Sequence, residues 1–107
     1  MKEKNVLRAL AALAQLNRLR VFRALVVAGQ SGATPGAIAK RLKVSPATLS
    51  FHLKELANAG LITQQRSGRN LIYRADYAAM TELLTYMTEN CCQGAACASP
   101  ATLDCAC

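Results

Sequence analysis

The stretch 42–75, LKVSPATLSFHLKELANAGLITQQRSGRNLIYRA, holds a helix start, a helix end and a hairpin in one continuous run. Ser45 followed by Pro46 predicts the helix start, because serine caps a first turn and proline suits the first helical position. Gly60 marks the end of this helix. One face of it carries apolar side chains at helical spacing, namely Leu49, Leu53 and Leu56. The first half of the stretch therefore predicts an amphipathic helix.

The second half of the stretch changes to a strand pattern. Two β-prone runs, Leu61–Arg66 and Leu71–Ala75, surround the segment SGRN. Short β-prone runs joined by a glycine-containing turn are typical of a β-hairpin. We therefore expect a hairpin with Gly68 at its tip directly after the helix.

Three further helices are predicted before this stretch. Residues 3–15 and a second segment, capped by Asn17 and ended by Gly29, show helical periodicity. Thr34 and Pro35 open a third helix with the same cap-plus-proline signal that opens the fourth. Two short helices joined by a tight turn form a helix-turn-helix. The apolar positions of the first segment are Val6, Leu10, Leu13 and Leu16.

A last helix follows the hairpin, with Asp76 as its cap. Its apolar residues repeat at 3-4-3 spacing, which is typical of a seam between two helices; contact within the same chain is the alternative. We expect a dimer interface formed by Tyr77, Met80, Leu84 and Met87, together with Val6 and Leu10.

The predicted fold is therefore mainly α with a β-hairpin wing: a homodimeric winged helix-turn-helix in the order α-α-α-α-β-β-α. The DNA-binding and dimerisation domain spans residues 1–90, and a flexible, cysteine-rich tail spans residues 91–107.

The distribution of charge predicts a polyanionic partner. The net charge is +7, and all 13 Lys and Arg residues precede residue 76. Double-stranded DNA is the simplest such partner; a merely solvated basic surface is the alternative. The second helix of a helix-turn-helix enters the major groove, and a wing reaches the phosphate backbone or the minor groove. The expected DNA contacts are Ser45, Pro46, Ala47, Thr48, Ser50, Phe51, His52 and Lys54 on the helix, and Arg66 and Arg69 on the wing.

Two other classes of protein fit the sequence poorly. No apolar stretch is long enough for a membrane span, and arginines interrupt the apolar positions of the N-terminal segment, so we expect a cytoplasmic protein. His52 is the only histidine, and we expect it to be structural or to contact phosphate rather than a metal. A phosphatase-like reductase needs an arginine shortly after its nucleophilic cysteine to hold the oxyanion. No arginine follows Arg74, whereas all the cysteines do, so the sequence argues against an enzyme.

The helix-turn-helix and wing resemble those of the ArsR/SmtB metalloregulators. The match rests on the spacing of Ser45, Ser50, His52, Leu53 and Leu56 and on the Gly-Leu that enters the wing, and it covers roughly residues 3–90. The resemblance implies a homodimeric repressor that leaves DNA when a metal ion binds. Two familiar effector sites are missing, because "GAIAKRL" has no cysteine and "DYAAMTELLTYMTEN" has no histidine.

The tail is the remaining place for an effector site. It holds every cysteine of the chain, namely Cys91, Cys92, Cys97, Cys105 and Cys107. Adjacent Cα atoms lie about 3.8 Å apart, too close for an unstrained disulfide, so the vicinal pair suits one shared thiophilic atom. Some arsenic-responsive members resemble this chain in carrying a Cys-Cys pair and a later cysteine beyond the last helix.

Three sulfur ligands without histidine suit As(III) or Sb(III), which form three pyramidal bonds. We therefore predict Cys91, Cys92 and Cys97 as ligands of this effector, and no permanent cofactor. A tetrahedral Cd²⁺ or Zn²⁺ site, with Cys105 or Cys107 as auxiliary ligand, stays an alternative. So does a thiol-redox or persulfide switch.

Overall fold

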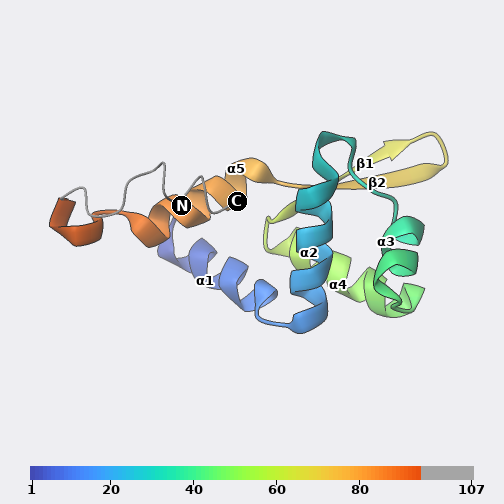
Figure 1. Ribbon diagram of the computed structural model, residues 1–107, viewed down its shortest axis with the longest axis horizontal. Helices are drawn as coiled ribbons and strands as arrows, with labels where there is room; N and C mark the ends of the chain where they lie inside the picture. Colours follow the sequence, from blue (N-terminus) through green and yellow to red (C-terminus); the bar gives the residue numbers. More distant parts are fainter. Residues whose placement is uncertain (95–107) are drawn as a thin grey trace.

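The computed structural model describes residues 1–94. They form five α-helices and one antiparallel hairpin (Figure 1) in the predicted order. Among these residues, no helix is long and apolar enough to cross a membrane. The elements are α1 (Glu3–Leu13), α2 (Leu16–Ala28), the short turn η1 (Gly29–Ser31), α3 (Pro35–Leu42), α4 (Pro46–Asn58), β1 (Ile62–Ser67), β2 (Asn70–Ala75), α5 (Tyr77–Thr88) and the short turn η2 (Cys91–Gly94).

The predicted caps of α3, α4 and α5 are present. Thr34, Ser45 and Asp76 each accept a hydrogen bond from the backbone N–H three residues later, at 3.3, 3.2 and 3.1 Å. Each side chain thereby satisfies one of the N–H groups that a first helical turn leaves without a partner. These local signals fix the two helices of the helix-turn-helix and the start of the last helix.

The corner between α1 and α2 differs from the prediction. α1 ends at Leu13, and the cap of α2 is Gln15 instead of Asn17: the Gln15 side-chain oxygen accepts the Arg18 N–H at 2.9 Å. Arg18 also donates from Nε to the Ala12 carbonyl at 2.7 Å. This bond satisfies a carbonyl at the C-terminus of α1, so α1 ends earlier than its apolar pattern suggested.

α2 and α4 form the centre of the hydrophobic core and contribute six of its fourteen buried residues in the described part of the chain. They pack against each other, and α1, α3, the hairpin and α5 close the core around them (Figure 1). The predicted inner positions of α4 are 0–3% exposed. Burial of each such leucine favours folding by about 1.5–3 kcal/mol. The larger buried side chains are Val6, Val21, Phe22, Leu25, Ile38, Leu49, Leu53, Leu56, Leu61, Ile62 and Leu83.

The hairpin is joined to the segment before α3. Its register pairs Ile62 with Ala75 at the base and Ser67 with Asn70 at the tip. Ala33 and Tyr73 exchange two backbone hydrogen bonds, at 2.9 and 2.8 Å. Gly32, with φ +68°, precedes this bridge, and a Cβ placed there would lie 2.5 Å from the Tyr73 carbonyl oxygen. Only glycine fits this close approach.

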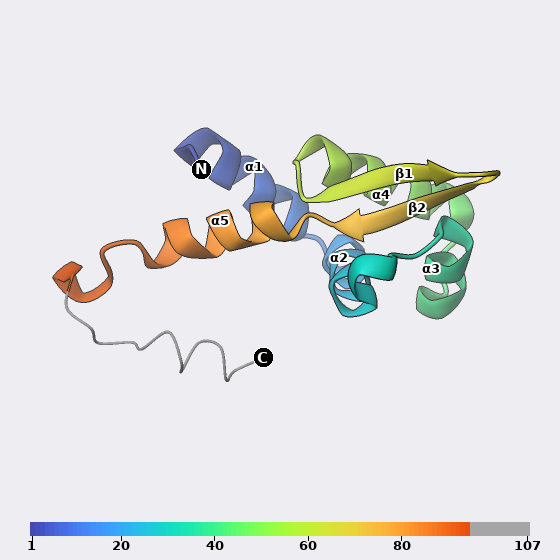
Figure 2. The same ribbon diagram turned by 90° about the horizontal axis from the view of Figure 1, so that it is seen from above.

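The wing tip and α5 lie at opposite ends of the described molecule. Figure 2 shows the hairpin extending to one side and α5 to the other, with α1 beside the first part of α5. The helix-turn-helix lies on the wing side. The predicted DNA-contacting elements are therefore grouped at one end, away from the end of α5.

Candidate nucleic-acid interface and thiol pair

The exposed face of α4 carries most of the residues predicted to contact DNA. All of Ser45, Pro46, Ala47, Thr48, Ser50, Phe51 and Lys54 are exposed. The Phe51 side chain is 56% exposed. In this position the ring does not gain the favourable free energy that its burial would give. A hydroxyl, an ammonium group and apolar groups on one helix face suit base edges, phosphate and thymine methyls. The face therefore has the chemistry of a major-groove surface.

The first turn of α4 is held by a pair of hydroxyl groups. The Ser45 hydroxyl donates to Thr48 Oγ1 at 2.8 Å while it also accepts the Thr48 N–H. Both side chains are exposed at the helix N-terminus, where backbone N–H groups and the helix dipole favour an anion. This arrangement suits a phosphate oxygen, and the phosphate contact of both hydroxyls stays a prediction.

His52 differs from its predicted DNA contact. The side chain is 5% exposed and packs on the inner side of α4, so it offers no surface to DNA. Within residues 1–94, its Nδ1 has no hydrogen-bond partner. Burial, and to a smaller degree the nearby Arg18 guanidinium, lowers the pKa of His52 below its usual 6.5. The imidazole is a core group of the recognition helix.

The two wing arginines are exposed as predicted. Arg69 lies in the two-residue turn of the hairpin beside Gly68, whose φ is +63°, and Arg66 lies near the end of β1. Arg74 was not predicted to have a role. Its Nε donates to the Gln30 carbonyl at 2.6 Å and its Nη1 to Gln65 Oε1 at 2.7 Å. Arg74 thus fixes the base of the wing.

The predicted dimer seam divides into two parts. Tyr77 and Met80 are half-buried against the core of their own chain, and the Tyr77 hydroxyl donates to the Val26 carbonyl at 3.1 Å. Leu84 and Met87 are 58% and 60% exposed. Only the second half of the α5 seam is therefore available to a partner.

The first helix divides in the same way. Val6, expected at the interface, is only 3% exposed and belongs to the core of one chain, so it offers no surface to a partner. Leu10 is 38% exposed, and Leu7, which was not predicted to be at the interface, is 62% exposed. With Leu84 and Met87 these residues give α1 and α5 an apolar outer surface.

The vicinal cysteines follow α5 directly. Cys91 and Cys92 are exposed, and their sulfur atoms lie 3.7 Å apart. Asn90, Cys92 and Gln93 all have positive φ, between 54° and 58°, an uncommon conformation for residues other than glycine. No group of three or more candidate ligands occurs within residues 1–94. Cys97, Cys105 and Cys107 lie outside the described residues.

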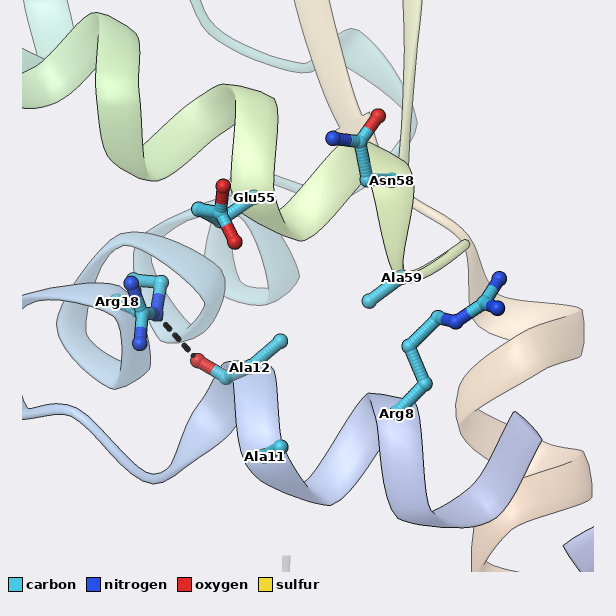
Figure 3. A pocket seen from close by; sticks show the side chains of 7 residues that line it. All are labelled: Arg8, Ala11, Ala12, Arg18, Glu55, Asn58 and Ala59. Atoms are coloured by element: carbon cyan, nitrogen blue, oxygen red, sulfur yellow. Dashed lines mark hydrogen bonds between the residues drawn. The ribbon is translucent and has the colours of Figure 1, made fainter. Parts of the chain in front are cut away.

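A hollow of about 630 Å³ lies between α1, α2 and α4. Figure 3 shows Arg18 and Glu55 at one end of it and Arg8 and Ala59 at the other, with the bond from Arg18 to Ala12 below. Small alanine side chains along α1 leave this space open. Arg18 thus ties α2 to the end of α1 and lines the hollow together with Glu55 of α4.

Comparisons with known proteins agree with this arrangement. Residues 13–65 match the model of a helix-turn-helix domain family. An ArsR-like transcriptional regulator from Rhodococcus sp. RHA1 is 26% identical, with 78% of this chain and 76% of that chain covered and a TM-score of 0.71. A possible transcriptional regulator for arsenical resistance is 30% identical over 74% of this chain and 79% of its own, with a TM-score of 0.63.

A third solved structure concerns assembly. The homodimeric winged helix-turn-helix DNA-binding domain of a possible ArsR-family regulator from Mycobacterium bovis is 26% identical, covers 87% of this chain and 86% of its own, and has a TM-score of 0.64. No curated protein matches the sequence. The fold and the matching proteins are those of DNA-binding regulators, not of enzymes.

Proposed function

Because the chain belongs to the ArsR/SmtB family of winged helix-turn-helix transcriptional regulators, we propose that it is a repressor released from DNA by arsenite or antimonite. In this proposal two copies bind an operator together. As(III) or Sb(III) then binds thiolates at the end of α5, and the dimer leaves the operator. The observation that carries the effector assignment is the exposed Cys91–Cys92 pair at the end of α5.

The exposed face of α4 and the wing support the DNA-binding part of the proposal. Ser50, Phe51 and Lys54 form the surface that would face base edges, and Arg66 and Arg69 would contact phosphate or the adjacent minor groove. Phosphate contacts release counterions, so operator binding should weaken steeply as salt is added.

The apolar outer surface of α1 and α5 supports the dimer. Leu7, Leu84 and Met87 are each about 60% exposed, and large exposed apolar side chains on two helices that pack together favour an interface. The relative from Mycobacterium bovis is a homodimer. Two domains related by a twofold axis would read the two half-sites of a palindromic operator.

The Cys91–Cys92 pair supports the effector assignment through its geometry and its position. Two sulfur atoms 3.7 Å apart can both bond to one thiophilic atom, which leaves a third bond for Cys97. Cys91 lies three residues beyond the end of α5, and the exposed Leu84 and Met87 lie in the last two turns of that helix. An ion bound there would therefore act on the end of the predicted dimer helix.

Release requires the effector to bind more tightly to the DNA-free dimer than to the dimer on its operator. Turning an operator from almost fully occupied to almost fully free takes about 5.5 kcal/mol of differential affinity. Three metal–sulfur bonds formed only in the released arrangement can supply this difference. We expect the ion to draw the segment after α5 into a compact turn and thereby change how the two α5 helices pack.

A gel shift with single Cys→Ser variants tests the assignment. In reducing buffer, wild-type protein should leave the DNA upstream of its own gene when arsenite is added. C91S, C92S and C97S should still bind this DNA but stay on it. C105S and C107S serve as matched controls with the same chemical change elsewhere in the tail. Normal release by all three ligand variants would refute the arsenite site.

The same variants separate the alternative effectors. Cd²⁺ or Zn²⁺ in place of arsenite would show four ligands in X-ray absorption spectra, and C105S or C107S would then impair release. A thiol-redox or persulfide switch would respond to oxidant or persulfide with no metal present. Arsenic bound to oxygen or nitrogen instead of three sulfur atoms would contradict the proposal directly.

A further inference from the structure

The outer face of α2 carries apolar and basic side chains that the core does not use. Leu16, Leu19 and Val27 are 59%, 44% and 62% exposed, although the inner face of the same helix is fully buried. Arg20 and Arg23 lie between them on this outer face at helical spacing. Large apolar side chains gathered on one exposed face are uncommon in soluble proteins and mark an interaction site.

A groove between α2 and α3 collects these side chains. It has a volume of about 370 Å³, and α3 adds Arg41 and the half-buried Leu42 to its wall. Ala24 supplies a small side chain within the lining. Three arginines and no acidic residue line the groove. Its surface is therefore apolar along the middle and positively charged along the edges.

The groove shares no residue with the surface proposed to read DNA. α4 packs on the inner face of α2 through Leu49, Leu53 and Leu56, so the exposed face of α4 points to the far side. In Figure 2, α2 and α3 lie on one side of the hairpin, whereas α4 runs behind it. A protein bound to DNA through α4 therefore keeps this groove open to another molecule.

We propose that the α2–α3 groove binds an acidic amphipathic helix of a partner protein. The exposed apolar residues of α2 run from Leu16 to Val27, about 16 Å along the helix, which matches three turns of a partner helix. Apolar side chains at every third or fourth position of that helix would fill the groove. Glutamates beside them would face Arg20, Arg23 and Arg41, and arginine is a frequent anchor at interfaces.

This interaction is separate from arsenite sensing. The groove residues lie on α2 and α3, whereas the thiols follow α5, so a regulator on its operator can hold a partner until the effector releases the dimer. The DNA-bound regulator would thereby recruit the partner protein to the promoter or hold it there inactive.

The probe is a fluorescein-labelled synthetic peptide of about four helical turns. It carries leucine at every third or fourth position and glutamate on the flanks. Fluorescence anisotropy with the full-length protein should give saturable binding. A second peptide with lysine in place of glutamate should not bind. A ternary complex with operator DNA should form without loss of DNA affinity.

Two matched double variants make the test specific. R20Q/R23Q should weaken peptide binding by about tenfold or more, because it removes two anchors from the groove. R66Q/R69Q removes the same charge from the wing and should change peptide binding by no more than about twofold, since surface charges elsewhere act only through screened, long-range attraction. L19S/V27S should also weaken the peptide complex about tenfold, and circular dichroism would verify that each variant is folded.

Several results would overturn the proposal. Equal weakening by the groove pair and the wing pair would mean non-specific attraction to a basic protein. If R20Q/R23Q bound the peptide as tightly as the wild-type protein does, the peptide would bind outside the groove. Loss of operator binding in R20Q/R23Q would make the groove a DNA contact, and assembly beyond a dimer that L19S/V27S abolishes would make it a contact between copies.

Discussion

At the scale of the residue, the recognition helix buries one histidine. His52 lies three positions after Leu49 and four before Leu56, so it falls on the inner stripe of α4 and not on the exposed face. Its Nδ1 lacks a partner within the described residues, and Arg18 lies near it. A charged imidazole would therefore meet both burial and a like charge.

The state of His52 predicts a dependence of stability on pH. Its folded-state pKa is lowered, so the unfolded chain takes up the proton first as the pH falls. The free energy of unfolding should be flat above about pH 6.5 and decrease below it, with no further loss once the folded-state pKa is passed. Urea unfolding between pH 5.5 and 7.5 measures this slope. H52Q should remove the slope, whatever its effect on stability at neutral pH; an equal slope in H52Q would contradict the assignment.

Gly32 provides a second prediction at the same scale. In G32A the new Cβ would meet the Tyr73 carbonyl at 2.5 Å and Ile72 Cγ2 at 2.7 Å, at a positive φ. We expect a loss of at least about 1–3 kcal/mol from this backbone strain, or several degrees in Tm. G36A is the matched control, because no atom lies within 4 Å of a Cβ there and alanine favours a helix. A Tm for G32A equal to that of G36A would show that the close approach does not matter.

At the scale of the element, the helix starts depend on hydrogen bonds within a single turn, whereas the corner before α2 depends on a bond between two helices. Thr34-Pro35, Ser45-Pro46 and Asp76 predicted three helix starts correctly, because each cap bonds within its own first turn. The corner before α2 depends on Arg18 reaching back to Ala12, which no local pattern shows.

The candidate site divides along the same line. The exposed face of α4 and the wing arginines followed from periodicity and turn chemistry. The inward position of His52 was also present in that periodicity, in its spacing from Leu49 and Leu56. The bonds from Arg74 to Gln30 and Gln65 could not be predicted, because they join segments that are distant in sequence and meet only after the hairpin packs.

The wing is the element whose role in DNA binding is easiest to isolate. R66Q/R69Q should lower operator affinity and reduce the slope of log K against log salt by about 2, since two phosphate contacts are lost. R20Q/R23Q, in the α2–α3 groove, should leave this slope unchanged. Filter binding or anisotropy over a range of salt concentrations measures both. An unchanged slope in R66Q/R69Q would mean that the wing does not touch phosphate.

At the scale of the whole molecule, the monomer leaves an apolar surface on α1 and α5 that its own core does not cover. Leu7, Leu84 and Met87 are the most exposed apolar side chains of these two helices. Val6, Tyr77 and Met80 instead hold α1 and α5 against the body. One set of apolar residues thus builds the domain, and the other is available for pairing.

L84E/M87E should convert the protein to a monomer. Charged side chains placed on both sides of a twofold contact repel each other and lose the apolar burial. Sedimentation equilibrium would measure the mass, and operator affinity should fall together with it. A78E, an exposed position on the opposite side of α5, is the control and should stay dimeric. A dimer of undiminished stability in L84E/M87E would place the interface elsewhere.

The separation of α5 from the wing tip has a mechanical consequence. The two project from opposite ends of one body, and the hairpin is fastened to that body through Arg74 and the Ala33–Tyr73 bridge. In a rigid-body rotation, displacement grows with distance from the axis. A slight rotation of the subunit about α5 therefore moves the arginines of the wing tip farther than it moves the parts close to α5. A small rotation is therefore enough to move the tip away from a phosphate.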